Sequence, residues 1–249
     1  MTGTVTTLVV PPGRTGAGGA ANGGYLCGML ASRVPDHRPA AGRRPVVTLL
    51  EPVPVGSALT VSDAGRHHVV EAGDRLLATV AWASATIPGL PRVSPVQARA
   101  ASAGYLGRQD HPFPDCFACG PARVEDGLLL TPGPVEPGLV ACSWVPKGAA
   151  ESPVPAEVVW SALDCAAGWT GDARVRPAVL TRMTAEIVEP VPTGVEVVVV
   201  AGRVGENGRT VTNASSLLDP DGQVLARALT TWTFLGISDA SVRTTVKDL

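Results

Sequence analysis

The phrase EPVPVG at residues 51–56 returns almost unchanged as EPVPTG at residues 189–194, 138 residues later. Each copy follows a Gly- and Ala-rich apolar segment and precedes a valine-rich run, and each half then ends in an alternating stretch with a tryptophan, at residues 75–83 and 223–233. A phrase that recurs in the same context indicates two copies of one fold unit. Such a duplication allows one copy to lose a catalytic group that the other keeps.

The length and charge of the chain narrow the classes of function. Its 249 residues suffice for two domains of roughly 100–130 residues. The net charge is −2 and the only lysines are Lys147 and Lys247, so we expect no nucleic-acid partner. Gly and Pro interrupt every apolar run before about 18 residues, which predicts no membrane span. The first residues lack a signal-peptide pattern and the five cysteines are an odd number, so we expect a cytoplasmic protein.

The periodicity of the sequence predicts one helix and several antiparallel strands in each half, which is an α+β fold with a helix packed on a sheet face. In the first half we expect a helix from Asn22, its N-cap, to about Val34, and strands at 45–50, 58–62, 67–71 and 76–85. In the second half we expect a strand at 139–145, a helix at 156–170, and strands at 179–188, 195–203, 210–218 and 224–235.

These elements predict two units, at residues 1–90 and 116–237. The segment between them, 91–115, is rich in proline and has little periodicity, so we interpret it as a linker. The final residues, 238–249, are polar and we expect them to form a loose tail.

Beyond its first two residues, the predicted second helix contains a single carboxylate. Residues 158–171 read VVWSALDCAAGWTG, and Asp164 is the only acidic or basic side chain among them. A helix that is apolar around most of its circumference is buried, and a buried carboxylate without partners costs several kcal/mol. Such penalties concentrate at functional sites, which favours a general base or nucleophile facing a cleft. The alternative is a side chain that bonds a neighbouring strand or points to solvent. We interpret Cys165 as a small core residue.

The pair Cys116-x-x-Cys119 invites comparison with zinc sites. A structural zinc site takes four ligands, usually from two such pairs, and the nearby His111 and Cys142 have no standard spacing to them. We therefore interpret the pair as a Cys-Gly-Pro turn at the start of a strand and expect no metal. The chain also lacks a serine-nucleophile elbow and a phosphate-binding loop.

Four stretches together resemble the hotdog-fold acyl-CoA thioesterase superfamily. CFACGP at 116–121 with GLLL at 127–130 is similar to the opening of thioesterases related to the phenylacetate-pathway enzymes, and residues 159–168 are similar to their central helix, with Asp164 at the position of an acid. LDPDGQVLAR at 218–227 resembles the last hairpin of acyl-CoA thioesterase II, and NGGYL at 22–26 resembles a His-Gly-Gly helix start. The resemblance implies a double hotdog, with two helices each wrapped by an antiparallel sheet and the thioester site between the units.

The resemblance also implies how the site is shared. In the family, the thioester oxygen accepts from an N–H at the N-terminus of one helix, and the acid of that site comes from the helix of the partner unit. Within each helix, the acid stands eight residues after the first Gly of His-Gly-Gly. Here the position eight after Gly23 is Ala31, and Ala156 stands eight before Asp164. The first copy keeps the glycines without the acid, and the second keeps the acid without the glycines. We therefore expect one composite site per chain, with the Gly24 N–H and the Asp164 carboxylate, and an inactive second site.

Other residues are assigned through the same resemblance. It implies Thr181 and Thr230 as polar partners of Asp164, although Thr230 stands where the family has Gln. Substrate contacts are expected from Asn22, Gly23, Trp160 and Trp169. The substrate would be an acyl-CoA or an acyl-carrier thioester, with no cofactor apart from the coenzyme A of the substrate. Exposed sheet edges favour a homodimer. The alternatives are a hotdog hydratase or dehydratase, which pairs a His with an Asp, and a non-catalytic binder of acyl or coenzyme A ligands.

Overall fold

The computed structural model describes residues 5–36, 40–149 and 152–236, and the tail predicted at 238–249 lies outside them. It contains the α-helices α1 (Gly23–Ala31), α2 (Pro95–Ala103) and α3 (Ala156–Gly168). The strands are β1 (Thr6–Val9), β2 (Arg43–Leu49), β3 (Ala58–Asp63), β4 (His68–Ala72), β5 (Arg75–Ser84), β6 (Gly133–Glu136), β7 (Leu139–Trp144), β8 (Ala178–Ile187), β9 (Val197–Asn207), β10 (Thr210–Leu218) and β11 (Val224–Phe234). The predicted α+β class is confirmed.

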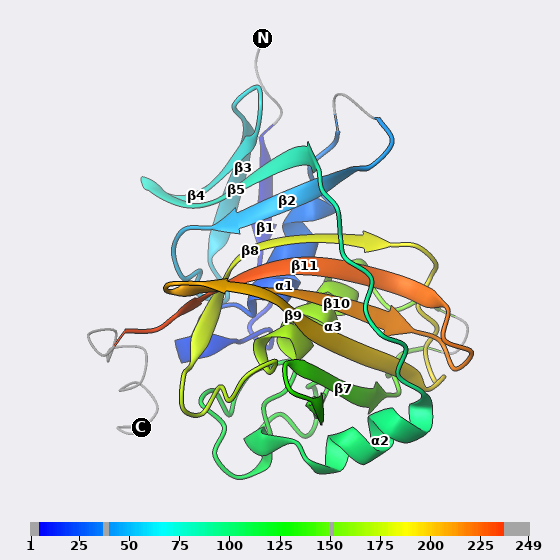
Figure 1. The fold of residues 1–249 in the computed structure, drawn as a ribbon. Helices are drawn as coiled ribbons and strands as arrows, with labels where there is room; N and C mark the ends of the chain where they lie inside the picture. Colours follow the sequence, from blue (N-terminus) through cyan, green and yellow to red (C-terminus); the bar gives the residue numbers. More distant parts are fainter. Residues whose placement is uncertain (1–4, 37–39, 150–151, 237–249) are drawn as a thin grey trace.

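All strands form one antiparallel sheet in the order β1-β3-β4-β5-β2-β8-β11-β10-β9-β7-β6. In the first half, the strands lie in the order β1, β3, β4, β5 and β2, and β1 is the strand that precedes α1 in the chain. The second half repeats this order with β7, β9, β10, β11 and β8, and adds β6 at its edge. The halves join where β2 pairs with β8, with Val47 opposite Met183 (Figure 1). The chain therefore has two halves of the same topology.

The repeated phrase has the same structural task in both halves. Pro54 forms a β-bridge with Ala20, three residues before α1, and Pro192 forms one with Pro153, three residues before α3. The glycines that end the two copies both have positive φ, 79° at Gly56 and 74° at Gly194, which favours glycine. The N–H of Gly56 donates to the carbonyl of Val10, just after β1, and the N–H of Gly194 donates to the carbonyl of Pro146, just after β7, each at 2.8 Å. The phrase is repeated because it fixes each helix start against the sheet.

Helices α1 and α3 lie side by side against one face of the sheet (Figure 1). Two glycines one turn apart on α1 allow their close approach. A Cβ on Gly24 would lie 2.5 Å from Cβ of Asp164, and one on Gly28 would lie 2.6 Å from Cα of Glu157. Any side chain at either position would force the helices apart. The glycines at the start of α1 thus bring Asp164 against that helix.

The segment predicted as a linker contains a helix that the sequence analysis did not anticipate. α2 begins with a capping box in which Ser94 and Gln97 exchange hydrogen bonds, with Pro95 in its first turn. It packs on the outer face of β7 and β9. The valine run of β9 is explained by this arrangement, since Val198 and Val200 pack toward α2 while Val197 and Val199 pack into the main core with α3. Pro95 begins this helix, although it counted among the prolines that led to the linker interpretation.

Element boundaries mostly agree with the expectations, with two clear differences. β9 runs to Asn207, whereas the strand was expected to end at residue 203. α1 ends at Ala31 rather than near Val34, because the Ser32 N–H turns back to the carbonyls of Gly28 and Leu30 and closes the helix. α3 begins at Ala156 as predicted, so Gly23 and Ala156 are the first residues of the two equivalent helices. Within the described residues, no helix is long and apolar enough to cross a bilayer.

Candidate active site

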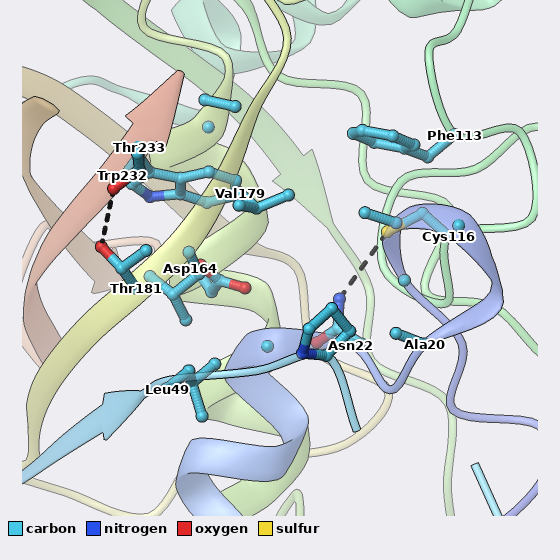
Figure 2. Close-up of a pocket in the computed structure, with 18 of the residues that line it drawn as sticks. Ala20, Asn22, Leu49, Phe113, Cys116, Asp164, Val179, Thr181, Trp232 and Thr233 are labelled. Atoms are coloured by element: carbon cyan, nitrogen blue, oxygen red, sulfur yellow. Dashed lines mark hydrogen bonds between the residues drawn. The ribbon is translucent and has the colours of Figure 1, made fainter. Parts of the chain in front are cut away.

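A cavity of about 470 Å³ opens where the two halves meet. Its walls come from the start of α1, the loop 111–119, the middle of α3 and the strands β8 and β11 (Figure 2). Most of the lining is apolar, with Leu49, Phe113, Val179 and Trp232 among its side chains. A largely apolar cavity with few polar groups is typical of a site for a small organic ligand.

Asp164 is the buried carboxylate of this cavity, with only 2% of its surface exposed. The N–H of Gly24 donates to its Oδ2 at 2.8 Å, whereas Oδ1 has no hydrogen-bond partner among the described residues. Burial raises the pKa of Asp164 well above its ordinary range, and the hydrogen bond from Gly24 opposes this shift. Figure 2 shows the carboxylate directed into the pocket. One oxygen is thus held in place, and the other is buried without a partner among the described residues.

The start of α1 is held by its N-cap. Asn22 Oδ1 accepts from the N–H of Tyr25 at 2.9 Å and from the hydroxyl of Ser161 at 2.8 Å, so the cap is tied to α3. Gly23 follows as the first helical residue and lines the cavity. An N–H at this position has no acceptor within the helix, and the helix dipole places partial positive charge there. The structure therefore brings together the predicted Asn22, Gly23, Gly24 and Asp164.

The remaining predicted residues lie in different surroundings. Thr181 and Trp169 line the cavity, and the hydroxyl of Thr181 donates to the carbonyl of Thr231 at 3.1 Å. Trp160 is buried against α1 at Gly28 and is not part of the described lining. Thr230 also lies away from the lining, because its hydroxyl donates to the carbonyl of Asn213 and accepts from Nε1 of Trp232. Gly24 supports Asp164 from behind the cavity wall.

The cavity wall also contains three cysteines that the sequence analysis did not bring together. The Sγ of Cys165 lies 3.4 Å from that of Cys116 and 3.2 Å from that of Cys119. Hydrogen bonds from Cys119 and Cys165 hold the pKa of the Cys116 thiol well below its usual range, whereas burial raises the pKa of the separate Cys142 thiol to about 12. The interpretation of Cys165 as a plain core residue missed this contact, since 46 residues separate it from Cys119.

His111 is a further residue of the lining. Its Nδ1 accepts from the N–H of Phe113 at 2.9 Å, and its Nε2 lies 3.3 Å from Sγ of Cys119. Burial lowers the pKa of His111, so the neutral ring is favoured. Its ring contacts Trp169 edge to face, with the ring centroids 5.2 Å apart. The sequence analysis considered His111 only as a metal ligand and did not place it in the same cavity as Asp164.

No family model and no curated protein matches the sequence. Solved structures with a similar fold include a protein of Novosphingobium aromaticivorans described as a proposed thioesterase, 15% identical over 93% of this chain and 96% of the other, with a TM-score of 0.62. An acyl-CoA thioesterase II of Mycobacterium marinum is 13% identical over 94% of both chains, with a TM-score of 0.55. A hot dog fold protein of unknown function from Alicyclobacillus acidocaldarius is 14% identical over 93% of both chains, with a TM-score of 0.52.

These structures match along nearly the whole chain, so the likeness in fold includes both halves. Identities this low show the fold alone. The chain has the hotdog fold of these structures.

Proposed function

We propose that the protein hydrolyses an acyl thioester with water, and that Asp164 is the general base. The observation that carries the proposal is the geometry of this carboxylate. It is buried on the wall of an apolar cavity, with Oδ2 fixed by the Gly24 N–H and Oδ1 without a partner among the described residues. Its raised pKa makes the ionised form a stronger base toward water.

The start of α1 supplies the complementary charge in this proposal. The sequence analysis assigned the oxyanion donor to Gly24, but that N–H is engaged by Asp164 at 2.8 Å. We assign the donor role to Gly23, which lines the cavity as the first residue of the helix. The thioester oxygen would accept from this N–H, and the helix dipole would stabilise the negative charge that develops on it.

The reaction then follows from these two groups. A water between Asp164 and the thioester carbon gives its proton to Oδ1 as its oxygen attacks the carbon. The tetrahedral oxyanion forms at the start of α1. When the carbonyl reforms, the carbon–sulfur bond breaks, and the thiolate takes the proton back from Asp164. The products are a carboxylic acid and a thiol.

The double hotdog, the substrate carrier and the assembly belong to this proposal as well. The identical strand order of the two halves supports a double hotdog. The M. marinum relative in fold is described as an acyl-CoA thioesterase, which supports coenzyme A as the carrier. We also propose a homodimer through the sheet edges β1 or β6 and a reducing, cytoplasmic location for its free cysteines.

The test is thiol release from short, long and aromatic acyl-CoAs by the wild type and Asp164→Asn. We expect turnover of at least one substrate and a fall of about 100-fold in the variant, the usual scale for a lost acid–base group. Asp172→Asn makes the same chemical change on the half-exposed side chain next to Arg174, and should keep full activity. Equal turnover by the wild type and Asp164→Asn would refute the assignment of the base.

His111 supports a second candidate, hydration or dehydration of an acyl thioester, because it lines the same cavity as Asp164. Both of its ring nitrogens have partners, Phe113 and Cys119, which makes it a weaker proton carrier. An enoyl thioester added to the same substrate panel separates the two reactions, since hydration consumes the double bond without releasing thiol. Binding of a thioester without either reaction would instead support the non-catalytic binder.

A further inference from the structure

Three sulfur atoms converge on the cavity wall from two distant segments of the chain. Cys116 and Cys119 come from the loop between the halves, and Cys165 comes from α3. Their Sγ atoms are 3.2 Å apart for Cys119 and Cys165, 3.4 Å for Cys116 and Cys165, and 3.7 Å for Cys116 and Cys119. All three side chains are buried, yet all three line the cavity. An ion arriving through the cavity could therefore reach them.

We propose that Cys116, Cys119 and Cys165 are the ligands of a zinc ion. Thiolates are preferred zinc ligands, and a tetrahedral site with Zn–S bonds of about 2.3 Å places its sulfurs about 3.8 Å apart. The three separations approach this value and differ little from one another, so small outward shifts of the side chains would accommodate the ion. A disulfide would instead require one pair at about 2.0 Å and would leave the third sulfur aside.

Each sulfur also faces an N–H donor, as metal-bound thiolates commonly do. Asn22 Nδ2 lies 3.7 Å from Sγ of Cys116 and 4.0 Å from Sγ of Cys165. His111 Nε2 lies 3.3 Å from Sγ of Cys119. Because His111 Nδ1 accepts from the N–H of Phe113, Nε2 carries the proton of the neutral ring and donates to the sulfur. His111 is therefore an outer partner of the site, and the three thiolates are its protein ligands.

The conformation of the loop that carries Cys116 and Cys119 is fixed by contacts within the protein. The N–H of Gly120 donates to the carbonyl of Cys116 at 2.8 Å and closes the turn. A Cβ on Gly120 would lie 2.2 Å from the carbonyl oxygen of Pro114, so the turn requires glycine there. The N–H of Phe117 donates to the carbonyl of Thr15 at 2.8 Å, which anchors the turn to the first half. The fold thus presents both thiols to Cys165 in advance.

Three protein ligands leave one position of a tetrahedral zinc ion to a water or to an atom of a cavity ligand. The site would tie the loop between the halves to α3 at the residue next to Asp164. The zinc proposal can be tested independently of the proposed hydrolysis, because zinc content is measured without any substrate. Its presence would make the cavity wall rigid where the base is located.

The test is the metal content of the full-length protein, purified under reducing conditions and measured by inductively coupled plasma mass spectrometry. We expect about one zinc ion per chain in the wild type and less than about a tenth of that in Cys165→Ala. Cys142→Ala is the matched control, because Cys142 is equally buried but lies outside the cluster, and it should keep its zinc. Circular dichroism checks that each variant is folded.

Replacement of the zinc by Co²⁺ in the wild type gives a second readout that needs no variant. Sulfur-to-cobalt charge-transfer bands in the near ultraviolet and intense tetrahedral ligand-field bands should appear with one equivalent of Co²⁺. The inference is overturned if the folded, reduced wild type binds neither ion, or if mass spectrometry finds a disulfide among the three cysteines. It is equally overturned if folded Cys165→Ala keeps a full zinc equivalent.

Discussion

Asp164 shows how a single residue can be predicted from its setting. It is the only acidic or basic residue in the apolar stretch 158–171, and a charged group in such a stretch is conspicuous in the amino-acid sequence alone. The structure places it at 2% exposure with one oxygen lacking a partner among the described residues. Thr230 shows the limit of reasoning by resemblance. The resemblance implied it as a polar partner of Asp164, but which strand residues reach a cavity depends on neighbours such as Trp232.

The burial of Asp164 also predicts an effect on stability. Asp164→Asn keeps the size of the side chain and its acceptor for Gly24 while removing an ionisable group whose charged form is disfavoured by burial. The free energy of unfolding at neutral pH should therefore rise by about 1–3 kcal/mol, the scale of one relieved buried polar group. Chemical denaturation of both proteins measures it. A variant less stable than the wild type would mean that the charge is compensated in the folded protein.

The secondary-structure elements were predicted well where periodicity is long. The strands at 58–62, 210–218 and 224–235 were each placed within one residue of the structure. α2 was missed because its prolines lie at and before its first turn, where they begin a helix rather than end one. The contact between Cys165 and the loop of Cys116 could not be predicted, since it depends on how α3 packs and not on local spacing.

The pairing of α1 with α3 gives a prediction that separates packing from catalysis. In Gly24→Ala the new methyl group would meet Asp164, and in Gly28→Ala it would meet Glu157 and Trp160 instead. Both variants should lose about 1–3 kcal/mol of stability through overpacking. Only Gly24→Ala should also displace the base, and a displacement of about 1 Å costs about 100-fold in turnover.

The measurement pairs denaturation with thioester turnover per folded molecule for the two variants. Gly28→Ala is the control for packing alone. Comparable losses of turnover in both variants would show that the contact between Gly24 and Asp164 has no special part in catalysis.

At the scale of the whole molecule, the sequence predicted the duplication. The repeated phrase indicated two halves, and the structure repeats the strand order and the bridges before each helix. The complementary deficits of the two helices led to the expectation of one composite site, with the Gly24 N–H as oxyanion donor and Asp164 as the acid. In the structure the Gly24 N–H donates to Asp164 at 2.8 Å, which is why we moved the donor role to Gly23. The cavity itself, and the place of His111 in it, required the three-dimensional arrangement.

The joined sheet predicts how the molecule unfolds. One core cluster includes Leu26 and Val47 of the first half together with Leu163 and Met183 of the second. The two halves should therefore unfold as one cooperative unit. Native-state hydrogen exchange should give the amides of β2 and β8 the same opening free energy as global unfolding. An earlier opening of β2 would show that the first half is an independent unit.

The central claim is that one site is built from the start of α1 and the carboxylate of α3. The most direct measurement is a crystal structure of Asp164→Asn with an intact acyl-CoA. The account predicts the thioester oxygen within hydrogen-bond distance of the Gly23 N–H and the thioester carbon facing the side chain at position 164. A thioester bound elsewhere, with this cavity free of the acyl group, would contradict it.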